Sequence, residues 1–159
     1  MLLFGDQKIT PYLWFKDQAE EAIDFYVSIF KNAGIENITR YGEGAPMPAG
    51  TVMTGIFYLE GQRFLALNGG PHFSFTPAVS FCIECDSQQE VDYYWNKLGK
   101  GGSENPCGWL TDKFGLSWQV VPKVLGELLQ DRDVDRAGRV MNAMHQMKKI
   151  EIAKLIDAL

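Results

Sequence analysis

The sequence predicts an α+β protein made of two tandem βαβββ units with a cleft between them, followed by C-terminal helices. An internal repeat is the first observation: Ile23-Asp24-Phe25-Tyr26 reappears as Val91-Asp92-Tyr93-Tyr94, 68 positions later (from 23 to 91). In both copies a strand-like apolar run precedes an aromatic-rich helical stripe. After Pro122 the pattern becomes helical and no longer repeats. A duplicated unit indicates a pseudo-twofold arrangement, in which the cleft between the copies is the expected ligand site.

The first copy covers about residues 9–69. Its opening strand is expected over residues 9–15, because apolar side chains alternate there. Asp17 is the expected N-cap of the following helix, and Glu20, three residues later, completes a capping-box pattern. The remaining strands of this copy are expected at residues 35–41, 51–59 and 63–68, after a loop rich in Gly and Pro over residues 42–50.

The second copy covers about residues 78–122, and a strand is expected over residues 78–85. Ser87 and Glu90 form another capping box before a helix. Residues 1–122 are expected to form a single domain, and residues 123–159 a helical extension. Shorter strands are expected at 104–106, 108–112 and 116–121, and the extension is expected to hold one helix over 124–129 and one over 134–159.

Composition excludes several classes of function. The chain of 159 residues is 46% hydrophobic and 22% charged, within the usual range of globular domains. A net charge of −5 and a pI near 5.0 give no electrostatic reason to bind nucleic acid or an anionic membrane. No apolar run approaches the roughly 20 residues that span a bilayer, and no signal peptide is recognised. Three cysteines, an odd number, favour reduced thiols in the cytoplasm.

Several stretches carry a resemblance to a known superfamily. They lie at residues 9–15, 21–26, 64–71, 78–81, 107–119 and 141–150, and together they span nearly the full chain. The chain resembles the vicinal oxygen chelate superfamily (glyoxalase, bleomycin resistance, extradiol dioxygenase), and within it the PhnB-like branch often labelled 3-demethylubiquinone-9 3-methyltransferase. The resemblance implies that the two sheets curl into a half-open barrel around the cleft. A homodimer is the expected partner arrangement.

Superfamily enzymes hold a divalent ion with His, Glu or Gln from the first and last strands of each copy. By resemblance those positions fall on Thr10 or Pro11 in the first strand and on Gln119 in the last strand of the second copy. The other positions are Leu65, Ala66 or Asn68, and Ala78 or Ser80. Because one amide cannot hold a metal ion against water, we expect no metal ligands and no cofactor. The methyltransferase label is also unsupported, since neither Gly69-Gly70 nor Gly101-Gly102 joins a strand to a helix.

Alternation along the first strand places Tyr12 and Trp14 on one face, and Leu13 and Phe15 on the other. The second face is expected to meet the helix, because the matching positions of the second copy are also apolar. The first face is expected to look into the cleft. A mostly apolar ligand site is therefore expected from Tyr12, Trp14, Asn68, Ser80, Cys82 and Gln119. The alternative is that these side chains fill a closed barrel. Phe73, Phe75 and Met47 are expected either to form a lid or to cover a dimer patch.

Glu84 is the one carboxylate expected on the cleft face, and it is the candidate catalytic residue. Buried among aromatic rings, it would act as a general acid or base. The alternative is a glutamate in water at the end of a strand. Cys82 and Cys85 have the spacing of a redox or zinc pair, but residues three apart on a strand point to opposite faces. We therefore expect structural thiols.

These observations favour a small-molecule-binding protein without a metal, with an apolar or aromatic ligand. Two alternatives stay open: a metal-dependent lyase or dioxygenase-like enzyme of the same superfamily, and a structural or regulatory dimer without a ligand. The sequence does not decide whether the protein is an enzyme.

Overall fold

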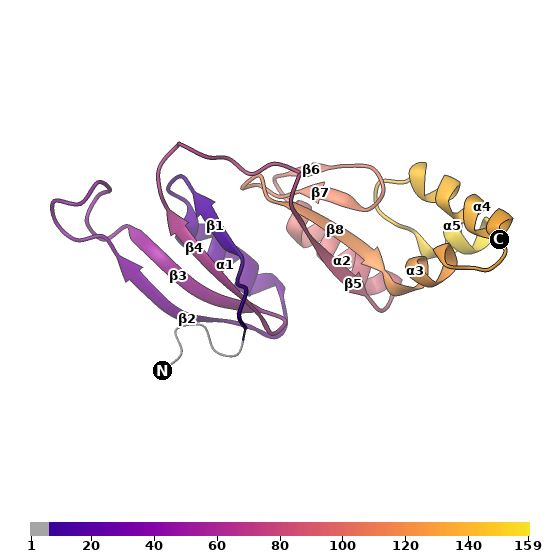
Figure 1. Ribbon diagram of the computed structural model, residues 1–159, viewed down its shortest axis with the longest axis horizontal. Helices are drawn as coiled ribbons and strands as arrows, with labels where there is room; N and C mark the ends of the chain where they lie inside the picture. The colour runs from indigo at the N-terminus through magenta and orange to yellow at the C-terminus, as the bar shows by residue number, and fades with distance from the viewer. Residues whose placement is uncertain (1–6) are drawn as a thin grey trace. The chain divides into compact units, whose positions relative to one another are not determined.

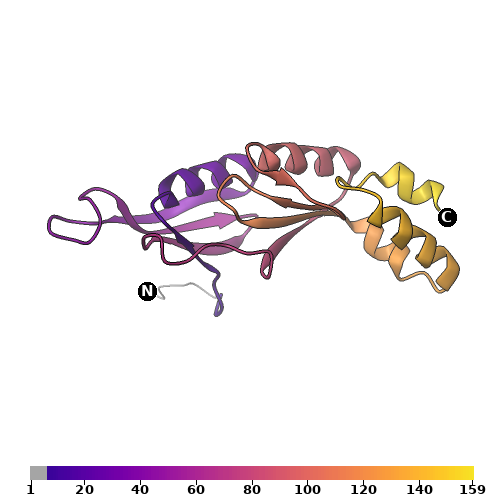
Figure 2. The ribbon, with the colours of Figure 1, turned by 90° about the horizontal axis from the view of Figure 1, so that it is seen from above.

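The computed structural model describes residues 7–159, which form two compact units. The first unit ends at Ser74, and the second extends from Phe75 to Leu159. Each unit contains one four-stranded sheet with a helix packed on it (Figures 1 and 2). We describe the two units separately.

The first unit contains the strands and helix expected of the first copy. Along the chain these are β1 (Tyr12–Phe15), α1 (Ala19–Ile29), β2 (Ala33–Arg40), β3 (Val52–Leu59) and β4 (Gln62–Asn68). The sheet order is β1-β4-β3-β2. β1 runs parallel to β4, whereas the other two pairings are antiparallel. The parallel pair requires a crossover, and the chain between β1 and β4 includes the helix that covers the sheet.

The second unit repeats this connectivity. Its elements are β5 (Ser80–Cys85), α2 (Gln88–Gly99), β6 (Ser103–Glu104), β7 (Trp109–Thr111) and β8 (Ser117–Pro122). The sheet order is β5-β8-β7-β6, with β5 parallel to β8. The predicted duplication of a βαβββ unit is confirmed, and strand ends differ from the predicted ends by a few residues, as usual.

Aromatic side chains fill the space between α1 and the first sheet. Tyr26 of α1 stacks on Phe57 of β3 with ring centroids 6.4 Å apart, and Phe57 stacks on Phe64 of β4 at 5.4 Å. Gly55 of β3 lets the helix come close, because a Cβ there would lie 2.5 Å from Cδ1 of Ile23. The face of β1 that carries Leu13 and Phe15 is buried, as the alternation predicted.

The two helices begin in different ways. α2 has the expected capping box: the Ser87 side chain accepts from the Glu90 N–H, and the Glu90 carboxylate accepts from the Asp86 N–H. The prediction of Asp17 as the N-cap of α1 is wrong. The N-cap residue is Gln18, without a side-chain cap bond. The first N–H of α1, at Ala19, instead donates to Oδ1 of Asn68, at 2.9 Å.

The C-terminal segment forms three helices where the pattern predicted two. They are α3 (Lys123–Leu129), α4 (Val134–His145) and α5 (Ile152–Asp157). The predicted single helix over 134–159 is therefore wrong. Between α4 and α5 the chain leaves the helix, and the N–H groups of Cys107 and Gly108 donate to the carbonyls of Met147 and Lys148. These tertiary hydrogen bonds favour a non-helical backbone here, although the spacing of apolar residues is that of a helix.

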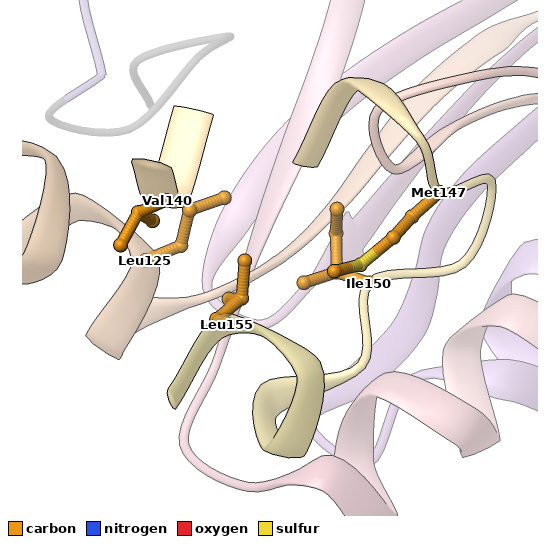
Figure 3. Close-up of a cluster of buried hydrophobic side chains, with 5 residues drawn as sticks. All are labelled: Leu125, Val140, Met147, Ile150 and Leu155. Atoms are coloured by element: carbon orange, nitrogen blue, oxygen red, sulfur yellow. The ribbon is translucent and has the colours of Figure 1, made fainter. Parts of the chain in front are cut away.

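The three helices share a small apolar core in the second unit (Figure 3). In the close-up, Ile150 and Met147 lie on the non-helical segment, next to side chains from the helices. Its buried members are Leu125, Val140, Met147, Ile150 and Leu155. Gly108 is close to this core, since a Cβ there would lie 3.0 Å from Cγ1 of Ile150.

α2 holds the C-terminal segment with polar groups. Gln88 donates to the Ile150 carbonyl at 3.0 Å and accepts from the Ile152 N–H at 2.8 Å. Asp92 accepts from Gln88 and from Lys149, both at 2.9 Å. The hydrogen bonds from Gln88 and Lys149 hold the pKa of Asp92 below its usual value. The segment after Pro122 thus packs on its own unit.

None of the helices between residues 7 and 159 has both the length and the apolar character that crossing a bilayer requires.

Candidate functional site

The first sheet has an open face, opposite α1, that carries two of the expected site residues. Tyr12 pairs with Leu65 and Trp14 pairs with Leu67 in the parallel register of β1 and β4. β3 adds Thr54, which pairs with Leu67. This face of the sheet is mainly apolar. Tyr12 is 50% exposed, and partial burial raises the pKa of its phenol.

A pocket of about 530 Å³ lies over this face. Strand residues of the sheet line it, together with residues 41, 46 and 47 of one loop and residues 69–72 of another. All of its lining residues belong to the first unit. The lining residues are Trp14, Tyr41, Pro46, Met47, Met53, Thr54, Leu67, Asn68, Gly69, Gly70, Pro71 and His72.

Trp14 is held in a fixed orientation in this pocket. Its indole N–H donates to the Gly70 carbonyl at 3.0 Å. The Phe73 ring meets it edge-on, with centroids 5.0 Å apart and planes at 80°. The indole also lies directly against Gly69, where a Cβ would be 2.2 Å from its nearest ring atom. A rigid aromatic wall results, and an ordered wall suits the binding of an apolar ligand.

Asn68 lines the pocket, but its side-chain amide is already hydrogen-bonded to the backbone. It accepts from the Ala19 N–H and donates to the Val52 carbonyl at 3.0 Å. The residue is 1% exposed. Its own carbonyl accepts a hydrogen bond of 2.8 Å from the Tyr41 hydroxyl. Asn68 therefore joins the start of α1 to β3 and positions Tyr41 at the pocket.

The remaining expected site residues belong to the second unit. Gln119 donates to the Ser80 hydroxyl at 3.0 Å, so the structure brings these two side chains together. Cys82 pairs with Gln119 in the register of β5 and β8 and is exposed. The second unit thus carries a small polar group on the face that matches the pocket face of the first unit.

Glu84, the candidate acid or base, is exposed. Two thiols on the same strand differ in environment. Burial raises the pKa of Cys85 to about 12, and burial together with the charge of Glu84 raises the pKa of Cys82. Cys82, Cys85 and Cys107 are all free thiols. The raised pKa values leave Cys82 and Cys85 with little nucleophilic thiolate at neutral pH.

Sequence reasoning missed several pocket residues. Tyr41 directly follows β2, Thr54 and Leu67 share the open face with Trp14, and His72 was treated only as part of the joint between copies. Alternation in residues 52–59 and 62–68 carried a signal for Thr54 and Leu67. Met47, one of the three expected lid residues, does line the pocket.

With this geometry in place, comparison with known proteins identifies the family. The family model described as 3-demethylubiquinone-9 3-methyltransferase matches residues 7–121. The chain belongs to this family. None of the curated proteins matches the chain. The match stops before the C-terminal helices, which are therefore additional to the part that defines the family.

Solved structures support this membership. The PhnB protein of Bacillus cereus is 38% identical, with a TM-score of 0.68, and the alignment covers 73% of this chain and 99% of that protein. A Pseudomonas aeruginosa protein, 24% identical over 74% of this chain and 98% of its own with a TM-score of 0.63, shows the same fold. This PhnB-like chain is thus a member of the vicinal oxygen chelate superfamily.

A more distant member shows the fold alone. The fosfomycin resistance protein FosX of Listeria monocytogenes, solved with Mn(II) and sulfate, is 16% identical, with a TM-score of 0.57. The alignment covers 79% of this PhnB-like chain and 98% of FosX.

The residues of this PhnB-like protein do not fit a resident divalent ion. On the open face of the first sheet, the paired positions of β1 and β4 hold Tyr12 with Leu65 and Trp14 with Leu67, and leucine has no donor atom. In the second unit, Gln119 is bonded to Ser80. Across residues 7–159, no three His, Cys, Asp or Glu side chains gather closely enough to hold a metal ion. Such an ion requires several converging N, O or S ligands.

Proposed function

We propose that this PhnB-like protein binds an apolar or aromatic small molecule in the pocket of its first unit, without a bound metal. The observation that carries the proposal is the pocket itself. Its volume of about 530 Å³ falls within the range of small-molecule sites, and its walls are mostly apolar. Trp14, fixed by Gly70 and Phe73, provides a preorganised aromatic surface.

Binding without methyl transfer is supported by the connections between strands and helices. A nucleotide-cofactor methyltransferase uses a glycine-rich turn from a strand into a helix. Within residues 7–159, strands lead into helices at three places: residues 16–18, residues 86–87, and directly from Pro122 to Lys123. None of these connections contains glycine. We therefore do not propose methyl transfer, the activity named in the family description, for this protein.

The pocket is tested with 2-naphthalenemethanol, a neutral aromatic probe, and thermal unfolding of the full-length protein. A ligand at about 100 times its dissociation constant stabilises the folded state by about 2.7 kcal/mol. We expect a clear rise in Tm for the unchanged protein and its loss in Trp14→Ala. Trp109→Ala is the matched control, because Trp109 is a half-buried tryptophan of the second sheet outside the pocket. Equal Tm shifts in both variants, or no shift at all, would contradict the proposal.

We further propose that the protein is a cytosolic homodimer with no nucleic-acid or membrane partner. Three free cysteines support a reducing compartment. Exposed apolar side chains support self-association: Val79 is 65% exposed and Val134 is 80% exposed. Sedimentation equilibrium tests the assembly, and a monomer at micromolar concentration would contradict it.

A further inference from the structure

The polar side chains in the walls of the pocket already have hydrogen-bond partners. The Trp14 N–H donates to the Gly70 carbonyl, and the Tyr41 hydroxyl donates to the Asn68 carbonyl. The Thr54 hydroxyl is 2.5 Å from that of Thr39. A ligand that lies against these walls is therefore recognised mainly by apolar contact, because the wall groups have little hydrogen-bonding capacity left.

His72 is the exception among the lining residues. It is exposed, it lines the pocket, and in residues 7–159 no hydrogen bond or ion pair engages its imidazole. An imidazole ring can both donate and accept hydrogen bonds. His72 is thus the side chain at this pocket with free capacity for a polar group of the ligand.

The charges around the pocket favour one kind of polar group. No Asp, Glu, Lys or Arg is among the lining residues, and the other titratable group, the Tyr41 phenol, already donates to Asn68. An anionic ligand therefore meets no carboxylate in the pocket wall, and His72 is its one ionisable partner there. A cationic ligand would meet no wall group of opposite charge.

We infer that the molecule bound in this pocket has a flat apolar body and one acidic group, a carboxylate or an acidic hydroxyl, which pairs with His72. This inference rests on the proposed function, since it names the ligand class of the same pocket. The body lies against Trp14 and Leu67, and the acidic group is next to the imidazole. A charge-assisted hydrogen bond to a ring nitrogen is stronger than a neutral one.

The test compares two probes of matched shape, 2-naphthoate and 2-naphthalenemethanol, by calorimetric titration of the full-length protein at about pH 6. For a partly exposed pair we expect naphthoate to bind about fivefold more tightly. His72→Gln should remove that preference, and His72→Lys, which keeps a positive charge, should retain it. His145→Gln, a change at the exposed histidine at the end of α4, should leave both affinities unchanged.

The outcomes separate the two proposals. Equal affinity of the unchanged protein for both probes would overturn the acidic-ligand inference and leave the binding pocket standing. A preference for naphthoate that survives His72→Gln would overturn the assignment to His72. No binding of either probe would overturn the proposed function, and the inference with it.

Discussion

Trp14 can lie against the chain at Gly69 only because that residue has no Cβ. The backbone of Gly69 is not in the left-handed region, so the conformation itself admits other residues. What excludes them is the indole ring, three atoms of which lie within 2.5 Å of an added Cβ. The orientation of the pocket wall thus depends on the absence of one methyl group.

Gly69→Ala is therefore expected to displace the Trp14 indole, to weaken its hydrogen bond to Gly70 and to destabilise the protein by about 1–3 kcal/mol. The measurements are near-ultraviolet circular dichroism and urea unfolding. Gly126→Ala is the control, because nothing lies within 4 Å of its added Cβ and α3 should gain up to about 1 kcal/mol. In a Trp14→Ala background, where the ring is gone, Gly69→Ala should cost little further stability. Equal effects of Gly69→Ala with and without the indole would contradict this account.

The two thiols of β5 provide a second prediction for single residues. Cys85 is fully buried, with a pKa of about 12, whereas Cys82 is exposed. Iodoacetamide should therefore label Cys82 of the folded protein at mildly alkaline pH and leave Cys85 unlabelled until the chain unfolds. Because burial favours the neutral thiol of Cys85, its contribution to stability is complete below about pH 8.5 and is lost as the pH rises toward 12. Mass spectrometry of the labelled peptides measures which cysteine has reacted. Labelling of Cys85 in the folded protein would contradict this prediction.

At the scale of helices and strands, the sequence was informative where local signals act alone. The repeat, the strand alternation and the Ser87–Glu90 capping box all appear in the structure. Predictions were wrong where distant groups decide. Asn68, far along the chain, replaces Asp17 as the partner of the first N–H of α1. Residues 147–150 leave the helix for partners at Cys107 and Gly108.

Only part of the candidate site could be predicted from the sequence, for the same reason. Alternation placed Trp14 on the open face of the first sheet, where the pocket lies. It did not reveal Tyr41 or His72, since loops that return to a sheet leave no periodic signal. Nor did it reveal that the Asn68 amide is occupied by backbone groups, because hydrogen bonds between distant residues have no sequence signature.

The attachment of the C-terminal segment to α2 gives a prediction for an element. Gln88→Ala removes both hydrogen bonds to the backbone of residues 150 and 152 and the bond to Asp92. Amide hydrogen exchange over residues 147–159 should therefore become faster, with a loss of about 1–3 kcal/mol in stability. Gln89→Ala, the exposed neighbour, is the control and should change neither. Unchanged exchange in Gln88→Ala would show that the apolar core alone holds the segment.

At the scale of the whole molecule, each unit has its own sheet, helix and core, and the second also includes the C-terminal helices. The pocket lies within the first unit, while the polar pair Ser80 and Gln119 lies in the second. The duplication has therefore been followed by divergence. One copy now carries an apolar hollow and the other a polar group at related positions.

A whole-molecule prediction concerns metal ions. Because the open face of the first sheet offers leucine where a ligand would be needed, exhaustive dialysis against EDTA should leave Tm unchanged within error. The affinity for 2-naphthalenemethanol should also remain unchanged. Elemental analysis before dialysis provides the comparison. A stoichiometric zinc, manganese, nickel or iron content, with a fall in Tm after its removal, would contradict a metal-free protein.

Gln88 contacts residues 150 and 152 through main-chain atoms, and this has an evolutionary consequence. Hydrogen bonds to main-chain atoms do not depend on the side chains of the residues that carry them. The side chains of residues 150 and 152 can therefore change during evolution without loss of the hydrogen bonds to Gln88. Proline is the exception at position 152, because it has no N–H group to donate to the Gln88 side chain. Among diverged relatives that keep this fastening, we expect varied residues at that site, with proline missing.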